Sequence, residues 1–339
     1  MLTASCEPSS GRVPGRMAKT RVYRDGVLQK EDFPLADVSE FLAEPGTTVW
    51  ADLCAPTEAD LAELAEELGL HRLAVEDAVA EHQRPKLDRY DGHAFVAAYA
   101  VRFDARTGGV TTAEFGAFVT PRALVTVRKD DGFDIEPVVR LWDETPELAK
   151  SGVPFLLHGL LDHVVDGQYQ AVQALDDEVE ALEDLVFADR PDSSELQRRS
   201  FRLRKSLTAV RRVVLPMREV ISSLMRPDLQ LADELTRPYF EDVHDHARQA
   251  AEQTEALREL IATVRETQLN LQGNRLNLIM KKVTGWAAVI AVPTAVTGFY
   301  GQNVPYPGNG APSGFWTSAV LLLVLSLGLY GAFKKKDWL

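Results

Sequence analysis

The chain has 339 residues, with 37 lysines and arginines against 50 aspartates and glutamates and a formal net charge of −13. Hydrophobic residues make up 45% and charged residues 26%, a balance that excludes a collagen-like, a disulfide-rich or a wholly disordered protein. The excess of acid argues against a nucleic-acid partner, because binding to phosphates requires a basic surface. No glycine-rich nucleotide loop, paired nucleophile and base, or hydrolase metal motif is found, so we predict neither an enzyme nor a bound nucleotide or organic cofactor.

The first part of the chain mixes strand-like and helix-like pieces. Residues 1–17 are predicted to be a disordered leader, and residues 18–150 a cytoplasmic domain of the α/β or α+β class. The run Thr57-Glu-Ala-Asp predicts a capped helix start, and Gly69 predicts its end. Strands are predicted where β-branched and aromatic residues gather, at residues 47–53, 94–103, 114–120 and 123–128.

The next part of the chain is helical. Residues 151–228 are predicted to form a long helical hairpin, with helices at 155–188 and 193–224. Residues 229–282 follow as a stalk helix, whose apolar residues recur at three- and four-residue steps. This heptad pattern is typical of supercoiling helices, and we expect one face of the stalk to pack within the chain and another between chains.

No Asp, Glu, Lys, Arg or His occurs over residues 283–333. About 20 apolar residues cross a bilayer as a helix, so we predict transmembrane spans at 283–300 and 315–333, joined by a loop at 301–314. The alternative, a helical hairpin buried in a soluble core, would normally keep a polar stripe. Lysines precede the first span and begin the basic tail at 334–339. Both termini are therefore predicted to lie in the cytoplasm, and the protein to be a multi-pass protein of the cell membrane.

One face of the first span differs from the others, and we call it the polar seam. Its residues are small, polar or flexible: Asn277, Met280, Thr284, Ala287, Ala291, Thr294, Gly298 and Gly301. Close helix packing would also favour small residues, but the amide and hydroxyl groups of Asn277, Thr284 and Thr294 favour a wall that faces water. Two spans cannot enclose a pore, so we predict a homo-oligomer with cyclic symmetry around an aqueous path.

The end of the first span, Tyr300-Gly-Gln-Asn303, resembles the Tyr-Gly-Met-Asn motif of the CorA family of magnesium and divalent-cation transporters, with Gln302 in place of the methionine. Further segments are similar to that family: His82–Lys86, Leu215–Glu219, Tyr239–His246 and the ending Phe333–Leu339. The resemblance covers most of residues 45–339. It implies a funnel-shaped homopentamer, in which the α+β domain and long stalk helices are followed by a two-helix transmembrane hairpin.

The resemblance also implies roles for individual residues. A selectivity filter at the external mouth would comprise Tyr300, Gly301, Gln302 and Asn303, whose neutral oxygens suit a Mg²⁺ ion that keeps its water. The gate and pore lining would comprise Asn277, Met280, Val283, Thr284, Ala287, Ala291, Thr294 and Gly298. A regulatory Mg²⁺ site would use Asp242 and His246 together with Asp91 and Asp88, while Gly92 stands where a second acid would be expected. The spacing of Asp242 and His246 is equally that of an ordinary surface pair.

The function implied by the resemblance is passive transport of divalent cations, driven by the membrane potential and closed by cytoplasmic Mg²⁺. Mg²⁺ is the first expected substrate, with Co²⁺ and Ni²⁺ as further ones, and the expected partners are copies of the chain, the lipid bilayer and the cations. Two other hypotheses stay open. One is a zinc-transporting relative, and the other is a membrane-anchored cytoplasmic sensor or adaptor whose spans only tether it.

Overall fold

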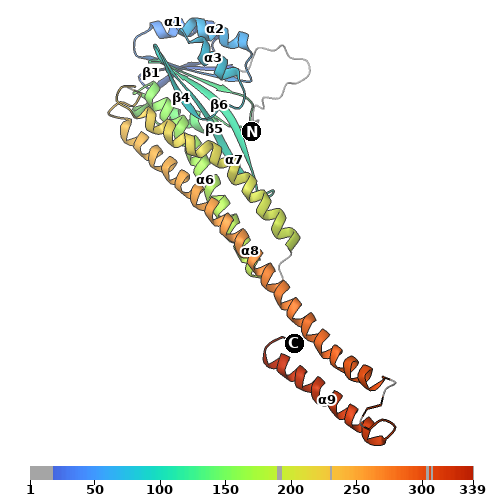
Figure 1. Cartoon of the computed structure of the whole chain (residues 1–339). Helices are drawn as coiled ribbons and strands as arrows, with labels where there is room; N and C mark the ends of the chain where they lie inside the picture. Colours follow the sequence, from blue (N-terminus) through green and yellow to red (C-terminus); the bar gives the residue numbers. More distant parts are fainter. Residues whose placement is uncertain (1–17, 189–192, 230, 303–304, 307, 339) are drawn as a thin grey trace. The chain divides into compact units, whose positions relative to one another are not determined.

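The computed structural model describes residues 18–188, 193–229, 231–302, 305–306 and 308–338 (Figure 1). The predicted leader at 1–17 lies outside these residues, and so does Asn303. The chain divides into two compact units between Ala262 and Thr263, and each unit is described by itself.

A single sheet organises the first unit. In the described part of the chain it has seven strands in the order β2-β1-β3-β7-β6-β5-β4. All neighbouring strands are antiparallel except β3 and β7, which are parallel. The strands are β1 (Ala18–Arg24), β2 (Val27–Glu31), β3 (Thr47–Cys54), β4 (Lys86–Tyr90), β5 (His93–Asp104), β6 (Gly109–Val119) and β7 (Ala123–Arg128).

Helices cover both faces of this sheet, because its strands alternate two apolar sets of side chains. On β5, Phe95 and Ala97 join the core under one helical layer, whereas Val96 and Ala98 join the core under the other. The first layer holds η1 (Leu35–Asp37), α1 (Val38–Ala43), α2 (Glu58–Leu68) and α3 (Arg72–Val79). The second holds α4 (Glu136–Glu144), α5 (Pro146–Ala149), α6 (Val153–Phe187), α7 (Ser193–Leu224) and the first turns of α8 (Arg237–Tyr300).

The predicted strands all form, with small differences at their ends. The predicted helix after Thr57 is α2, where Thr57 and Asp60 make a reciprocal capping box and Gly69 takes a left-handed conformation at φ +64°. Strands β1, β2 and β4 carry no strong apolar pattern and were not predicted. Strands β2 and β4 lie at the two edges of the sheet, where one side of a strand can remain polar.

Helix α8 begins at Arg237, later than the predicted start near Leu229. Asp233 and Thr236 exchange hydrogen bonds there: the backbone N–H of each donates to the other's side chain, at 3.1 and 2.7 Å. This local turn competes with helix for the backbone groups. Pro238 in the first helical turn needs no intrahelical partner for its nitrogen, so the helix starts at this point.

A buried polar network joins the parallel strands β3 and β7. The Arg128 guanidinium contacts both carboxylate oxygens of Asp52, at 2.6 to 3.1 Å, and donates to the Phe133 carbonyl oxygen at 3.0 Å. Asp52 also accepts from the Thr126 hydroxyl, which in turn accepts from the Trp50 indole N–H. The Asp52 side chain is 1% exposed, so each charge depends on these partners.

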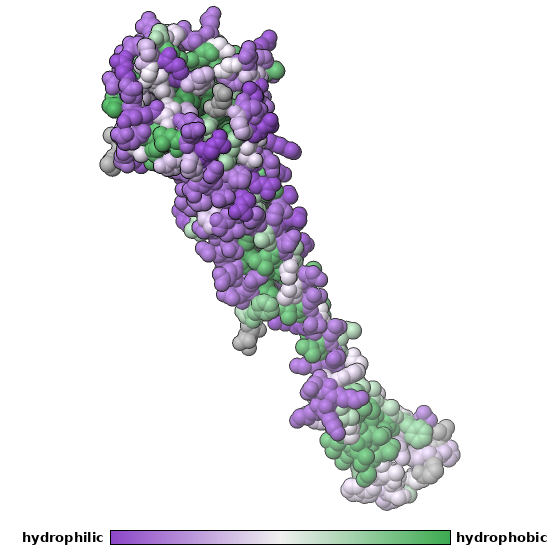
Figure 2. Space-filling model, turned by 90° about the vertical axis from the view of Figure 1, so that its left-hand side faces the viewer, coloured by the Kyte–Doolittle hydropathy of each residue, from purple (hydrophilic) through white to green (hydrophobic). Residues whose placement is uncertain are grey.

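The second unit contains the rest of α8 and helix α9 (Pro312–Lys335). Both helices are long and apolar enough to cross a membrane, yet only 11% of the most apolar window of α8 and none of that of α9 is buried. A core hairpin of a soluble protein would be mostly buried. Figure 2 shows the apolar residues of this hairpin gathered on its outer surface. Its exposed apolar surface fits a lipid environment.

Candidate ion pathway

The polar seam of α8 is exposed along its whole length. Met280 exposes 68% of its surface. The other members are also exposed, namely Asn277, Thr284, Ala287, Ala291, Thr294, Gly298 and Gly301. Within the described residues, the C-terminal tail approaches this face at its end near Asn277.

A different side of the same helix is covered. Gly285 and Val296 are buried, and at about 100° per residue they share one side of α8, away from the seam. The ring of Trp286 lies 6.3 Å from that of Tyr330 on α9, between centroids. The hairpin therefore buries one side of its first helix and leaves the polar seam open.

The hydroxyl groups of the span do not all point to open space. Thr294 donates to the Ile290 carbonyl oxygen at 3.0 Å, and Thr297 donates to that of Pro293 at 2.8 Å. A hydroxyl in an apolar segment gains by donating to the preceding turn, and its oxygen can still accept a hydrogen bond from water.

The C-terminal end of α8 is held by hydrogen bonds on both sides of the predicted filter. The Gly301 N–H donates to the Thr297 oxygen at 2.9 Å, and the Gln302 N–H donates to the Phe299 oxygen at 3.3 Å. The Tyr306 hydroxyl donates to the Tyr300 oxygen at 3.1 Å. Gly301 and Gln302 are exposed.

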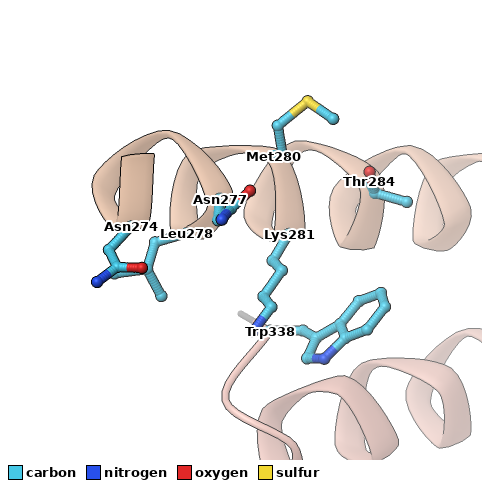
Figure 3. Close-up of a pocket in the computed structure, with 7 residues that line it drawn as sticks. All are labelled: Asn274, Asn277, Leu278, Met280, Lys281, Thr284 and Trp338. Carbon is cyan, nitrogen blue, oxygen red and sulfur yellow. The ribbon is translucent and has the colours of Figure 1, made fainter. Parts of the chain in front are cut away.

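At the other end of the seam, a shallow cavity of about 530 Å³ lies between α8 and the C-terminal tail. Its lining includes three seam residues: Asn277, Met280 and Thr284. In Figure 3 the Lys281 side chain points toward Trp338, whereas Met280 points away from it. Trp338 reaches this place because its backbone N–H donates to the Phe333 carbonyl oxygen at 2.9 Å and its ring stacks on that of Phe333.

The predicted regulatory residues on α8 face helix α6. The His246 Nδ1 atom lies 3.1 Å from Asp166 Oδ1, and its ring stacks on Tyr169 with centroids 5.9 Å apart. Burial, followed by the charges of Asp166 and Asp242, raises the pKa of Asp162 to about 6. The carboxylates of α6 and α8 therefore concentrate negative charge at this contact.

The other two regulatory candidates lie elsewhere in the first unit. Asp88 is on β4, where its carboxylate is 2.8 Å from Lys86 Nζ, and Asp91 precedes Gly92 in the turn from β4 to β5. Gly92 has φ +83°, a left-handed conformation that glycine adopts readily. No group of three or more Asp, Glu, His or Cys side chains able to hold a metal ion occurs within the described residues. The four candidates do not form one site within a chain.

Sequence comparison places these features in a family. The profile of the family described as "CorA-like Mg2+ transporter protein" matches residues 45–335. The chain belongs to this CorA-like family. It is similar to the cobalt/magnesium transport protein CorA of Thermotoga maritima, at 27% identity over 343 residues and 97% of each chain. It is also similar to the zinc transport protein ZntB of Yersinia enterocolitica, at 25% identity over 84% of this chain and 86% of that protein.

The fold agrees with a solved CorA-family structure. The complete structure of the CorA magnesium transporter from Methanocaldococcus jannaschii matches with a TM-score of 0.75 and 23% identity, covering 96% of this chain and 99% of that one. The predicted fold class, an α+β domain followed by a long helix and an apolar C-terminal helix, is therefore confirmed. As a member of the CorA-like family, the protein is a divalent-cation transporter of membranes.

Sequence reasoning missed three features of this pathway. Asp162 and Asp166 were not singled out, although they lie one turn apart on α6 and face the residues that were. The place of Trp338 beside Asn277 and Thr284 was not predicted. The role of Tyr306 depends on how the loop returns to α8, which no local pattern shows.

Proposed function

We propose that the protein is a passive channel for divalent cations, with Mg²⁺ as its first substrate and Co²⁺ and Ni²⁺ as further ones. The single observation that supports this proposal is the polar seam, a row of small and polar residues that stands exposed on one side of α8 while Gly285 and Val296 are buried on another. A funnel-shaped homopentamer would close these seams around a water-filled path. The hairpins would cross the cell (inner or plasma) membrane, with Lys281, Lys282 and the tail lysines at the cytoplasmic end.

The chemistry of this path suits an ion that keeps its hydration shell. Mg²⁺ loses water reluctantly and prefers oxygen ligands, and the residues from Tyr300 to Asn303 would offer neutral carbonyl and amide oxygens at the external mouth. The membrane potential contributes about 2.3 kcal/mol per charge per 100 mV, hence about 4.6 kcal/mol for a dication. No other energy source is needed for entry.

Two sets of residues would close the channel. Met280 and Val283 would form a hydrophobic constriction that blocks ions by dewetting, with Asn277 as a polar ring below it. Regulatory Mg²⁺ would bind between copies, where Asp242 and His246 of one chain meet Asp88 and Asp91 of the next. The placement of Asp162 and Asp166 on α6 near Asp242 supports this, since a dication would neutralise their charge; burial, followed by the charges of Asp166 and Asp242, raises the pKa of Asp162 to about 6.

The central test is Mg²⁺ uptake into liposomes that contain the purified protein. Wild type should take up Mg²⁺ when an inside-negative potential is imposed, and Asn303→Ala should abolish uptake. Asn309→Ala is the matched control, because Asn309 lies in the same loop and bonds to Tyr306 through its backbone N–H. A sensor or adaptor that is only tethered by its spans would show no uptake in any of the three proteins.

Gating is tested on the same liposomes loaded with millimolar Mg²⁺. Asp242→Ala should leave uptake running where wild type closes, whereas Asp245→Ala, at an exposed neighbour, should close normally. Closure of the Asp242→Ala protein would remove this residue from the sensor.

Zinc is the second candidate substrate, favoured by the similarity to ZntB. Uptake of Zn²⁺ and Mg²⁺ at equal concentrations decides between them, and the account predicts faster uptake of Mg²⁺.

A further inference from the structure

The Tyr306 hydroxyl is placed where helix α8 has a backbone acceptor to satisfy. A helix ends with four carbonyl groups that lack intrahelical partners. At the end of α8, the Thr297 and Phe299 oxygens accept from the N–H groups of Gly301 and Gln302, and the Tyr300 oxygen accepts from Tyr306. The ring of Tyr306 is half-buried and packs edge-on against that of Tyr300, with centroids 5.1 Å apart. One side chain thus caps the helix and returns the loop to it.

Tyr306 is in turn tied to the start of α9. The Asn309 N–H donates to the Tyr306 oxygen at 3.0 Å, the Ala311 N–H to the Gly308 oxygen at 3.1 Å, and the Gly314 N–H to the Ala311 oxygen at 3.1 Å. Gly308, at φ +91°, lies so close to Gly314 that a Cβ atom on Gly314 would collide with the Gly308 carbonyl. Consecutive turns therefore fix Tyr306 relative to the second helix.

We propose that Tyr306 is a positioning residue for the filter residues Tyr300, Gly301 and Gln302, an inference that rests on the proposed channel function. Its hydroxyl holds the Tyr300 oxygen, and the amides of Gly301 and Gln302 are bonded to the Thr297 and Phe299 oxygens. A filter that selects a hydrated dication must hold its oxygens at a set spacing, and groups that are already held in place lose little entropy when the ion enters. The loop has no acidic side chain that could attract the ion instead, so geometry carries the selection.

The first test is Tyr306→Phe, which removes the hydroxyl and keeps the ring. Loss of one hydrogen bond predicts a rise in the half-saturating Mg²⁺ concentration, and a fall in the preference for Mg²⁺ over Ni²⁺, of about three- to tenfold each. Tyr330→Phe is the matched control, because the Tyr330 hydroxyl has no hydrogen bond within the described residues and its ring sits beside Trp286. The proposal is overturned if Tyr306→Phe matches wild type in both quantities.

Two further measurements distinguish the effect of the hydroxyl from that of the ring, and test the hydroxyl without measuring transport. Tyr306→Leu removes both groups; if only this variant is impaired, ring packing is what matters and the positioning role of the hydroxyl is refuted. Amide hydrogen exchange at Gly301 and Gln302 needs no transport, and it should be faster in Tyr306→Phe than in wild type. If wild type conducts nothing, the channel function fails, and the exchange result still shows whether the hydroxyl fixes the loop. Unchanged exchange would contradict the proposal in every case.

Discussion

Polar groups lie in opposite environments in the two units of the chain. In the first unit, Asp52 and Arg128 are buried and each finds its partners within the same chain. In the second, the amide of Asn277 and the oxygens at Thr284 and Thr294 lie on an exposed face of α8. The first unit can thus satisfy its interior alone. The second makes physical sense only with other copies on one side and lipid on the other.

The largest predicted effect comes from filling the polar seam. Ala287→Trp would place a large ring on the face that lines the proposed pore, and it should reduce Mg²⁺ uptake by at least about tenfold. Leu323→Trp, on the exposed surface of α9, should leave uptake near wild type. Liposome flux and the size of the assembly in detergent check this pair. Equal loss in both variants would mean that the seam is an ordinary packing face.

The matching change in the first unit removes one charge from the buried network. Asp52→Ala leaves Arg128 without its carboxylate and should lower the free energy of unfolding by about 3–5 kcal/mol. Glu147→Ala, which breaks the exposed pair with Lys150, should cost about 0–1 kcal/mol. Denaturant unfolding of the full chain in detergent measures both. If both substitutions lower the free energy of unfolding by about the same small amount, the Asp52–Arg128 pair is not what holds β3 to β7.

A smaller effect is expected at the acidic contact of α6 and α8. Because the folded protein raises the pKa of Asp162 from 3.8 to about 6, the folded state binds the proton more tightly than the unfolded state. Stability contributed by this proton is present at low pH and is lost as pH rises from about 4 to about 6. Asp162→Asn should therefore stabilise the protein by about 1–3 kcal/mol at about pH 7.5, and by less at about pH 5.

Thermal unfolding of the two proteins at both pH values tests this expectation. A stabilisation that does not change with pH would show that the substitution acts through packing and not through charge.

The smallest predicted effect concerns a helix cap in the first unit. Thr57→Ala removes the side chain that accepts from the Asp60 N–H at 3.3 Å, and it should lower the free energy of unfolding by about 1 kcal/mol. Denaturant titration measures it. The exposed Thr208, whose hydroxyl only donates to Arg204 in mid-helix, is the control, since Thr208→Ala should be close to neutral.

The sequence predicted the structure best where a local pattern of residues indicates which side chains are buried. The apolar alternation of β5 and β7, the cap at Thr57 and the polar seam all follow from periodicity along the chain. Strand β4 was missed because Lys86-Leu-Asp-Arg-Tyr90 is largely polar, although it pairs with β5 in a local hairpin through the Asp91-Gly92 turn. The Tyr306 hydrogen bond escaped for a different reason, since the turns of the loop bring the hydroxyl back to Tyr300.

The same limit applies to the regulatory residues. Asp242 and His246 were found from the resemblance, but their neighbours Asp162 and Asp166 come from another helix. Charge patterns along one segment cannot show which carboxylates a second segment will place beside them.

The central claim, that the polar seam faces water and the opposite side does not, has one direct test. Ala291→Cys places a thiol on the seam, whereas Val292→Cys places one on a half-buried side of α8. Wild-type protein gives the background labelling of the two native cysteines. A membrane-impermeant thiol reagent should label the thiol at position 291 and block Mg²⁺ uptake, and it should leave the protein altered at position 292 conducting. Equal labelling of both, or labelling at position 292 alone, would contradict the account.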